Sequence, residues 1–416
     1  MPDYAGGNIK LPAKPKPIVA LVSPDLDKRH GTERRVAEWI SGLANDFELH
    51  LYSQHVADID LDNIAWHRIP ALPGPHLLNY IWWFVANHAW RAWDRRFRGI
   101  RADLVFSPGI NCLDADVVSV HIVFAEYAAK VASDLRLSAH PVLTWPTLIH
   151  RRLYYRLIAF LESLVYRNPQ TTLVLIARKT DLELARHYGR RKPSPVIYLG
   201  LDQSIFNPQR RVLLRERARR ELGYRPCRFV LLLIGNHWAN KGLPVLIESL
   251  ALLPELPFDL LVVGRENPES YRVVLESRRL NGRIQFKPPR ADVEFYYAAA
   301  DAYAGISLED TFALPPAEAM ACGLPVVVSA ANGTCEIITH ERDGLILQDP
   351  MDAAGLAEMI RHLYEDDAFR ARLGENAHRT AQQYTWERNA CELKAILQDV
   401  LHRKSQAGLA GLVHES

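Results

Sequence analysis

The chain has 416 residues, more than one ordinary hydrophobic core accommodates, and therefore predicts two domains of roughly 200 residues each. Its 48% hydrophobic and 24% charged residues are typical of a soluble globular protein. The net charge of +2 argues against nucleic acid as a partner, and five scattered cysteines argue against a zinc site or a disulfide framework.

No apolar run reaches the roughly 20 residues that a membrane-spanning helix needs. The segment 1–17 is rich in proline, lysine and glycine, and the apolar stretch 18–22 behind it is too short for the core of a signal peptide. Because free cysteines also fit a reducing compartment, we expect a cytoplasmic protein.

The first half of the chain alternates short apolar runs with helical or turn-rich segments. Strands are predicted at 18–23, 48–53, 64–69, 104–107, 117–121 and 172–176. This alternation predicts an open α/β sheet, and such sheets bind ligands at the carboxyl ends of their strands. Gly31, in the loop before a helix that begins near Thr32, and His121 lie at such ends. A simple strand-to-helix turn and a structural histidine are the alternative interpretations.

Two predicted helices of this half are rich in aromatic and basic residues. Residues 80–98 hold four tryptophans and four arginines, and 146–167 carries leucines on one face with Arg151, Arg152 and Arg156 beside them. Such helices suit contact with an anionic membrane surface. The alternative, which the residues alone favour, is that the tryptophans fill the core and the arginines face water.

The second half opens with a strongly apolar strand that ends at Gly235. Lys241 follows at the start of a helix, where its ammonium can neutralise a phosphate as a point charge. A solvated surface lysine is the alternative. Further strands, each followed by a turn with an arginine, are predicted at 260–264 with Arg265 and at 284–286 with Arg290.

The stretch 308–329 is the most distinctive of the chain. Asp310 and Glu318 are separated by seven residues, and between them a proline pair fits the first turn of a short helix that stops at Gly323. Free amides at a helix N-terminus favour anionic or hydroxyl-rich ligands, and the two carboxylates can accept hydrogen bonds from hydroxyl groups. In the alternative interpretation, Glu318 only complements the helix dipole.

This stretch resembles the E-x7-E region of retaining GT-B glycosyltransferases of family 4, with a match that runs from Asp310 to Val327. The family's Gly-Arg-Leu-x-x-x-Lys-Gly motif aligns with Gly235 and Lys241. The departures are Asp310 for glutamate, Ala313 for the glycine after Phe312, Asn236 for the motif's arginine, and Gly31 alone for a Gly-Gly pair. Glu309 becomes the first acid if the loop shifts by one residue.

The resemblance implies a GT-B fold, in which two Rossmann-like domains face each other across a cleft. Residues 1–204, completed by a crossing helix at 385–416, are then the acceptor domain, and 205–384 the donor domain. It also implies transfer of a sugar from a nucleotide-sugar with retention at the anomeric carbon, and no metal or other cofactor is expected. The expected acceptor is a glycan or a lipid-linked saccharide of polysaccharide biosynthesis, and the enzyme then works in the cytoplasm, with contact to the inner membrane face left open.

The same resemblance assigns roles to single residues. Lys241 and the amides of residues 312–314 stabilise the leaving diphosphate, Glu318 binds the ribose, Asp310 touches the donor sugar, and His121 lies in the cleft. His237, Arg265 or Arg290 replaces the missing arginine as second cation. The residues expected to bind the donor are Gly31, Gly235, Asn236, Gly264, Arg265, Arg290, Glu309, Phe312, Ala313 and Leu314.

Two other functions fit the same fold. A nucleotide-sugar 2-epimerase needs acid and base groups at C2 of the sugar, which the Asp310 and Glu318 motif does not indicate. A non-catalytic protein that binds carbohydrate or nucleotide-sugar is the second alternative, and the departures at Asn236 and Asp310 keep it open.

Overall fold

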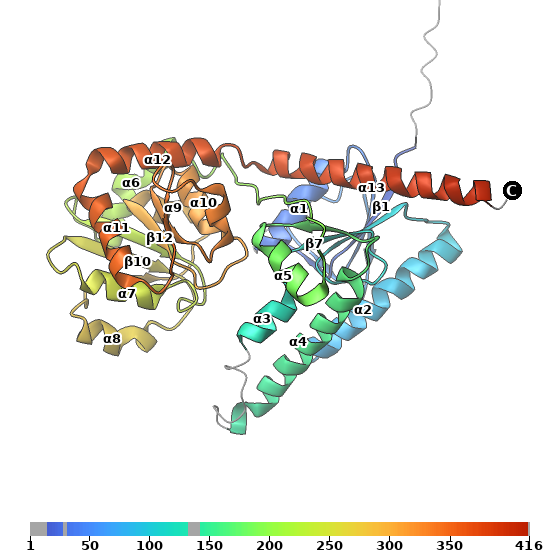
Figure 1. Cartoon of the computed structure of the whole chain (residues 1–416), viewed down its shortest axis with the longest axis horizontal. Coiled ribbons are helices and arrows are strands. Elements are labelled where there is room, and N and C mark those ends of the chain that lie inside the picture. The colour runs from blue at the N-terminus through green and yellow to red at the C-terminus, as the bar shows by residue number, and fades with distance from the viewer. Residues whose placement is uncertain (1–14, 28–30, 132–141, 415–416) are drawn as a thin grey trace, which may run out of the picture.

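The computed structural model describes residues 15–27, 31–131 and 142–414. Its framework is two six-stranded parallel sheets, one in each half of the chain, with helices on both faces of each sheet (Figure 1). In both sheets the strands lie in the order third, second, first, fourth, fifth, sixth, which is the doubly wound order of dinucleotide-binding folds. The predicted α/β architecture with Rossmann-like sheets is therefore confirmed.

The first sheet defines what we call the first domain. Its strands, in spatial order, are β5 (Ile64–Arg68), β3 (Glu48–Ser53), β1 (Ile18–Val22), β6 (Leu104–Pro108), β7 (Val117–Val120) and β8 (Thr172–Leu175). One face is covered by α1 (Gly31–Leu43) and α13 (Trp386–His414), and the other by α2 (His76–Trp93), α4 (Trp145–Tyr166) and α5 (Lys179–Tyr188). The smaller elements are the strand pair β2 (Asp25–Leu26) and β4 (His55–Val56), and the helices η1 (Asp94–Arg98), α3 (Phe124–Lys130) and η3 (Val142–Thr144).

The second sheet defines the second domain. Its strands, in spatial order, are β11 (Ile284–Lys287), β10 (Phe258–Val263), β9 (Phe229–Ile234), β12 (Ala302–Gly305), β13 (Val326–Ser329) and β14 (Leu345–Leu347). One face packs against α6 (Pro208–Leu222), α9 (Glu294–Ala299) and α10 (Leu314–Ala321), and the other against α7 (Leu243–Ala251), α8 (Arg272–Ser277) and α11 (Ala353–Glu365). Helix α12 (Asp367–Ala381) contributes to both cores, and η4 (Pro268–Tyr271) and η5 (Gly333–Ile337) are short connections.

Local sequence explains where these elements begin and end, as α6 and β9 illustrate. The side chain of Asn207 accepts a hydrogen bond from the Arg210 amide at 2.8 Å, and Pro208 fits the first helical turn. Gly223 ends the helix in the left-handed conformation, with a φ of 77°. The apolar run Phe229–Ile234 becomes a central strand that is almost entirely buried, as expected for a parallel sheet covered on both faces.

Helix α13 leaves the second domain and packs along the first (Figure 1). Its Leu393 and Leu397 join the apolar core around Trp39 of α1. Asn389 ties three segments together, because it accepts a hydrogen bond from the Trp39 indole and donates one of 2.5 Å to the Tyr198 carbonyl. Trp39 is 0% and Asn389 is 2% exposed, so water cannot replace either partner.

The tryptophans of the predicted helix 80–98 divide between core and surface. Trp83 is buried, and Trp82 and Trp90 pack partly buried against the same core. Trp93 is 58% exposed. The interpretation that these side chains fill the core is confirmed for the first three and is wrong for Trp93.

We expect Asn389→Ala to lower the free energy of unfolding by about 1–3 kcal/mol, because the Trp39 indole and the Tyr198 carbonyl lose a buried partner. The same substitution at the exposed Asn281 is the control and should change that free energy by no more than about 0.5 kcal/mol. Urea unfolding followed by tryptophan fluorescence measures both, and equal midpoints for the two variants would contradict the role assigned to Asn389.

Candidate active site

Two loops at the carboxyl end of the second sheet bring predicted catalytic residues together. One loop leads from β9 to α7 and carries Lys241, and the other leads from β12 to α10 and carries Asp310. The Lys241 ammonium forms an ion pair with the Asp310 carboxylate. The two side chains are 21% and 18% exposed, so the pair is shielded from bulk water but remains accessible.

Glycines allow the backbones of these loops to lie very close to their neighbours. A Cβ on Gly242 would lie 2.1 Å from the carbonyl oxygen of Ile306, and Gly242 also has a φ of 85°. A Cβ on Gly333 would lie 1.8 Å from the carbonyl oxygen of Thr311. Any side chain at either position would force the loops apart, and the ion pair between them depends on this close approach.

The second predicted carboxylate, Glu318, lies on α10 and accepts a hydrogen bond of 2.7 Å from the Tyr297 hydroxyl. Tyr297 is fully buried, and burial raises its pKa well above the ordinary value, so its hydroxyl stays protonated and donates. Burial also raises the pKa of Tyr303 on β12, and the charges of Asp310 and Glu318 add to this effect. Both carboxylates therefore lie near the same buried ring.

The N-terminus of α10 offers fewer free amides than the sequence predicts. Ala313 is the N-cap residue, and its N–H donates to the Thr334 hydroxyl at 3.0 Å. Leu314 opens the helix, but the two prolines behind it have no N–H. Phe312 is buried against the ring of Tyr198. The prediction that this run of amides faces a diphosphate is therefore wrong for Ala313, whose N–H already has a partner.

His121 follows β7 at the carboxyl end of the first sheet. Its Nε2 is buried and has no hydrogen-bond partner among the described residues. Burial lowers the pKa of His121 to about 3, and the positive charge of Arg35 acts in the same direction, so the imidazole is neutral at physiological pH. Gly31, the other predicted site residue of this domain, is the first residue of α1.

The turns after β9 and β10 pack on each other. Gly235 runs under the stem of Lys241, whose carbons a Cβ would meet at 3.0–3.4 Å. A Cβ on Gly264 would lie 2.3 Å from the Gly235 carbonyl oxygen. The side chain of Asn236 accepts a hydrogen bond of 3.1 Å from the Arg265 amide. Asn236 therefore ties the two turns together where the resembling family has a cation.

Three residues are predicted substitutes for that cation. Arg290 forms two hydrogen bonds of 2.8 Å with Asp292 and lies over the Phe295 ring, so its charge is already paired. His237 is 87% exposed and 3.8 Å from a glutamate. Arg265 is exposed and forms no ion pair within the described parts of the chain. Among the three, Arg265 is the cation that remains available.

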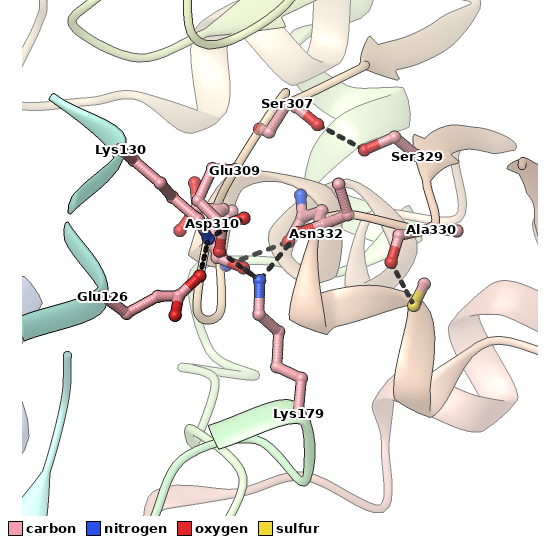
Figure 2. Close-up of polar contacts among 12 residues, drawn as sticks. Glu126, Lys130, Lys179, Ser307, Glu309, Asp310, Ser329, Ala330 and Asn332 are labelled. Atoms are coloured by element: carbon pink, nitrogen blue, oxygen red, sulfur yellow. Dashed lines mark hydrogen bonds and ion pairs between the residues drawn. The ribbon is translucent and has the colours of Figure 1, made fainter. Parts of the chain in front are cut away.

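Glu309, predicted to bind the donor, is held by the first domain (Figure 2). One carboxylate oxygen pairs with Lys179, and the other pairs with Lys130 at 2.7 Å. Lys130 in turn pairs with Glu126, one turn earlier on α3, at 3.2 Å. Both oxygens of Glu309 are thus occupied, and the residue links the two domains.

The sequence did not point to Lys130 or Lys179 as residues of the site. Lys179 opens α5 after β8, so a lysine at a helix start near the carboxyl end of a strand was the available signal. Glu336 of η5 is a further contact across the domains, because it accepts hydrogen bonds from the amides of Arg178 at 2.7 Å and Lys179 at 2.9 Å.

Comparison with known proteins finds similar sequences for the second half of the chain. Residues 215–380 match the family model of glycosyl transferases group 1. A D-inositol 3-phosphate glycosyltransferase of Nocardioides sp. is 32% identical over 240 residues, which cover 52% of this chain and 51% of that protein. The corresponding protein of Pseudarthrobacter chlorophenolicus is 33% identical over 218 residues, which cover 50% and 51%. The chain thus spans about half the length of the curated relatives it matches.

Solved structures with a similar fold cover nearly the whole chain. Sucrose-phosphate synthase of Thermosynechococcus elongatus has a TM-score of 0.70 at 20% identity, covering 93% of this chain and 100% of that one. WaaG, a glycosyltransferase involved in lipopolysaccharide biosynthesis, has a TM-score of 0.69 at 21% identity, covering 90% and 99%. Anabaena HepE in complex with UDP-glucose has a TM-score of 0.65 at 19% identity, covering 92% and 99%. Residues 215–380 are thus similar to the glycosyl transferases group 1 family, and the chain has the GT-B fold.

Proposed function

We propose that this chain is a retaining glycosyltransferase that moves a sugar from a nucleotide-sugar to an acceptor without a bound metal or other cofactor. The observation that carries the proposal is the pairing of Lys241 with Asp310 at the carboxyl end of the second sheet, inside the region that matches the family model. The relatives that match are named glycosyltransferases, and the similar HepE structure contains UDP-glucose.

In this proposal Lys241 stabilises the leaving diphosphate. When the bond between sugar and diphosphate breaks, positive charge develops on the sugar ring and negative charge on the diphosphate. In this step the Lys241 ammonium leaves its ion pair with the Asp310 carboxylate and pairs with the diphosphate, which carries more negative charge. Arg265 is exposed and can supply a second positive charge to the diphosphate. Asp310 is then free to accept a hydrogen bond from a hydroxyl of the sugar.

The remaining predicted residues orient the donor and the acceptor. Glu318 lies on the rigid helix α10, fixed by the Tyr297 hydroxyl, and binds the ribose hydroxyls. His121 is neutral, so it exchanges hydrogen bonds with sugar hydroxyls without adding charge to the cleft. Aspartate in place of glutamate at position 310 is one methylene shorter, which moves its contact point on the sugar and changes the preferred donor.

For the acceptor we propose a glycan or a lipid-linked saccharide of cell-surface polysaccharide synthesis. WaaG, which is similar in fold, takes part in lipopolysaccharide biosynthesis. The relatives that match half of the chain are named for D-inositol 3-phosphate, so this compound belongs in an acceptor screen as well.

We further propose that the first domain works while docked on the anionic inner face of a membrane, through a surface that we call the α2/α4 face. The two helices are adjacent, since the rings of His76 and Tyr154 are 4.8 Å apart and the Leu77 amide donates to His150 at 3.2 Å. No helix among the described residues is both long and apolar enough to cross a bilayer. Exposed apolar side chains of α2, η1 and α4 are Leu78, Ile81, Val85, Trp93, Phe97, Ile149, Leu153, Phe160 and Leu164.

Charge on the α2/α4 face complements anionic lipid. The only acidic residues of segments 76–98 and 145–166 are Asp94 and Glu162, and both are buried. The arginines of the same segments, in contrast, are mostly exposed. Helices that expose apolar and cationic groups but no carboxylate of their own have the composition that a headgroup region binds, although the exposed Asp114 pairs with Arg91 at the edge of α2.

Lys241→Ala tests the proposed stabilisation of the leaving group. We expect kcat to fall about 10²- to 10³-fold, because one preorganised charge is lost from the transition state. Lys394→Ala, which removes an ion pair of 2.6 Å with Asp46 far from the loops, is the control and should leave kcat unchanged. Steady-state release of nucleoside diphosphate is the measurement, and an unchanged kcat for Lys241→Ala would rule out its assigned role.

A screen of UDP-, GDP- and ADP-sugars in the presence of EDTA tests the function as a whole. The proposal predicts thermal stabilisation by one nucleotide class and acceptor-dependent release of its diphosphate despite chelation. An isomerised donor formed without any acceptor would instead indicate the epimerase. Stabilisation without turnover on any acceptor, D-inositol 3-phosphate included, would indicate a binding protein.

The membrane proposal predicts that the purified chain co-sediments with vesicles that contain phosphatidylglycerol. The double variant Arg95→Glu/Arg96→Glu should reduce partitioning at least roughly tenfold, because each basic group near such a surface contributes about 1 kcal/mol. Arg220→Glu/Arg225→Glu, two exposed arginines of the second domain, is the matched control. Equal sedimentation of both variants with the wild type would count against the α2/α4 face.

A further inference from the structure

Lys179, the first residue of α5, reaches from the first domain into the second. Its ammonium donates to the Glu309 carboxylate, to the Asp310 carbonyl at 3.0 Å and to the Ala331 carbonyl at 2.9 Å (Figure 2). An ammonium has three N–H donors, so all its hydrogen bonds are used. All three acceptors belong to the second domain.

The two carbonyls belong to chain segments that are already bridged to each other. The Asp310 amide donates to the Ala331 carbonyl at 3.3 Å, and the Gly333 amide donates to the Asp310 carbonyl at 3.0 Å. Lys179 caps this bridge from outside by binding one carbonyl of each segment. It therefore fixes the backbone at Asp310, the residue whose side chain pairs with Lys241.

Contacts within the second domain also hold the preceding part of this loop. The Asn240 side chain donates to the Glu309 carbonyl at 2.8 Å, and the Leu308 amide donates to the Asn240 carbonyl at 2.7 Å. Because Asn240 directly precedes Lys241, these two hydrogen bonds hold the loop after β9 against the loop after β12 as far as Glu309. The next carbonyl, that of Asp310, accepts one hydrogen bond from the Gly333 amide within the second domain and a second one across the domain boundary from Lys179.

The contacts of Lys130 and Glu336 distinguish Lys179 from a simple ion-pair partner of Glu309. Lys130 also pairs with Glu309, but its other partner is Glu126 of its own helix, and within the described parts of the chain it forms no hydrogen bond with the backbone of the loop. Glu336 accepts hydrogen bonds from the amides of Arg178 and Lys179 and from the Tyr198 hydroxyl at 3.0 Å. The start of α5 is thus anchored to the second domain, which sets where the Lys179 side chain points.

We propose that Lys179 is a positioning residue, which places Asp310 for sugar transfer only when the first domain is closed onto the second. Nucleotide binding by the second domain does not require it, whereas transfer does. The inference rests on the proposed function, because it assigns Asp310 to the donor sugar. Through this contact the acceptor domain controls the geometry of the donor site.

The test compares Lys179→Met with the wild type in the full-length chain. We expect kcat to fall roughly 10- to 100-fold, as for other small misplacements of a reacting group, while the dissociation constant of the nucleoside diphosphate changes less than about twofold. Lys404→Met, which removes an exposed ion pair of 2.8 Å with Asp116, is the matched control and should change neither value. A fall in nucleotide affinity that matches the fall in kcat would overturn the proposal.

Three further variants separate positioning from a simple ionic link. Lys130→Met removes a pair with Glu309 but no backbone contact, and kcat should stay near the wild-type value. Lys179→Arg keeps the charge, but its planar fork cannot meet the same three acceptors, so kcat should fall. The exchange Lys179→Glu/Glu309→Lys restores an ion pair without the carbonyl contacts and should not restore kcat. A wild-type kcat for the double variant Lys179→Glu/Glu309→Lys would overturn the proposal. So would a fall in kcat for Lys130→Met equal to that for Lys179→Met.

Hydrogen exchange provides a readout that does not depend on turnover. Lys179→Met should speed exchange of the Asp310 and Gly333 amides roughly tenfold relative to Lys404→Met, because the bridge loses its cap. Unchanged exchange would overturn the inference even in an active enzyme. If the wild type transfers no sugar from any donor, the proposed function fails while this exchange result still decides the role of Lys179 in the loop.

Discussion

The candidate site depends on backbone segments that lie closer together than any side chain would allow. Gly242 against the Ile306 carbonyl and Gly333 against the Thr311 carbonyl bring the loops after β9, β12 and β13 into direct backbone contact. Side chains on these loops therefore lie close to one another. The Lys241 side chain packs against Gly235, which has no Cβ, and pairs with Asp310. The position of the charges is thus set by the main chain, which is the least adaptable part of the structure.

The charged groups of this region mostly neutralise one another. Lys241 pairs with Asp310, and Glu309 pairs with Lys130 and Lys179. Partly buried charges of this kind are costly unless they are paired, so this pairing offsets the cost of burying them. A ligand with a diphosphate and several hydroxyl groups can replace such contacts one for one, since it supplies both an anion for the lysine and donors for the carboxylate.

The sequence predicted those features that depend on neighbouring residues. The strand that ends at Gly235, the short helix before Gly323 and the carboxylates Asp310 and Glu318 all follow from short-range patterns, and the structure contains these elements. Features that depend on distant segments were not predictable. The Ala313 amide is used by Thr334, and Glu309 is held by lysines from the other half of the chain. Each of these partners becomes evident only once the loops are placed in space.

The crossing of α13 has a consequence for biosynthesis. Residues Leu393, Leu397 and Val400 complete the core that contains Trp39, although more than 300 residues separate them from it in the chain. During translation the second domain leaves the ribosome whole, whereas the first must wait for the last helix before its apolar face is covered. The nascent first domain therefore exposes its apolar face for longer than the second does, and loss of α13 removes part of the core of the half of the protein that is made first.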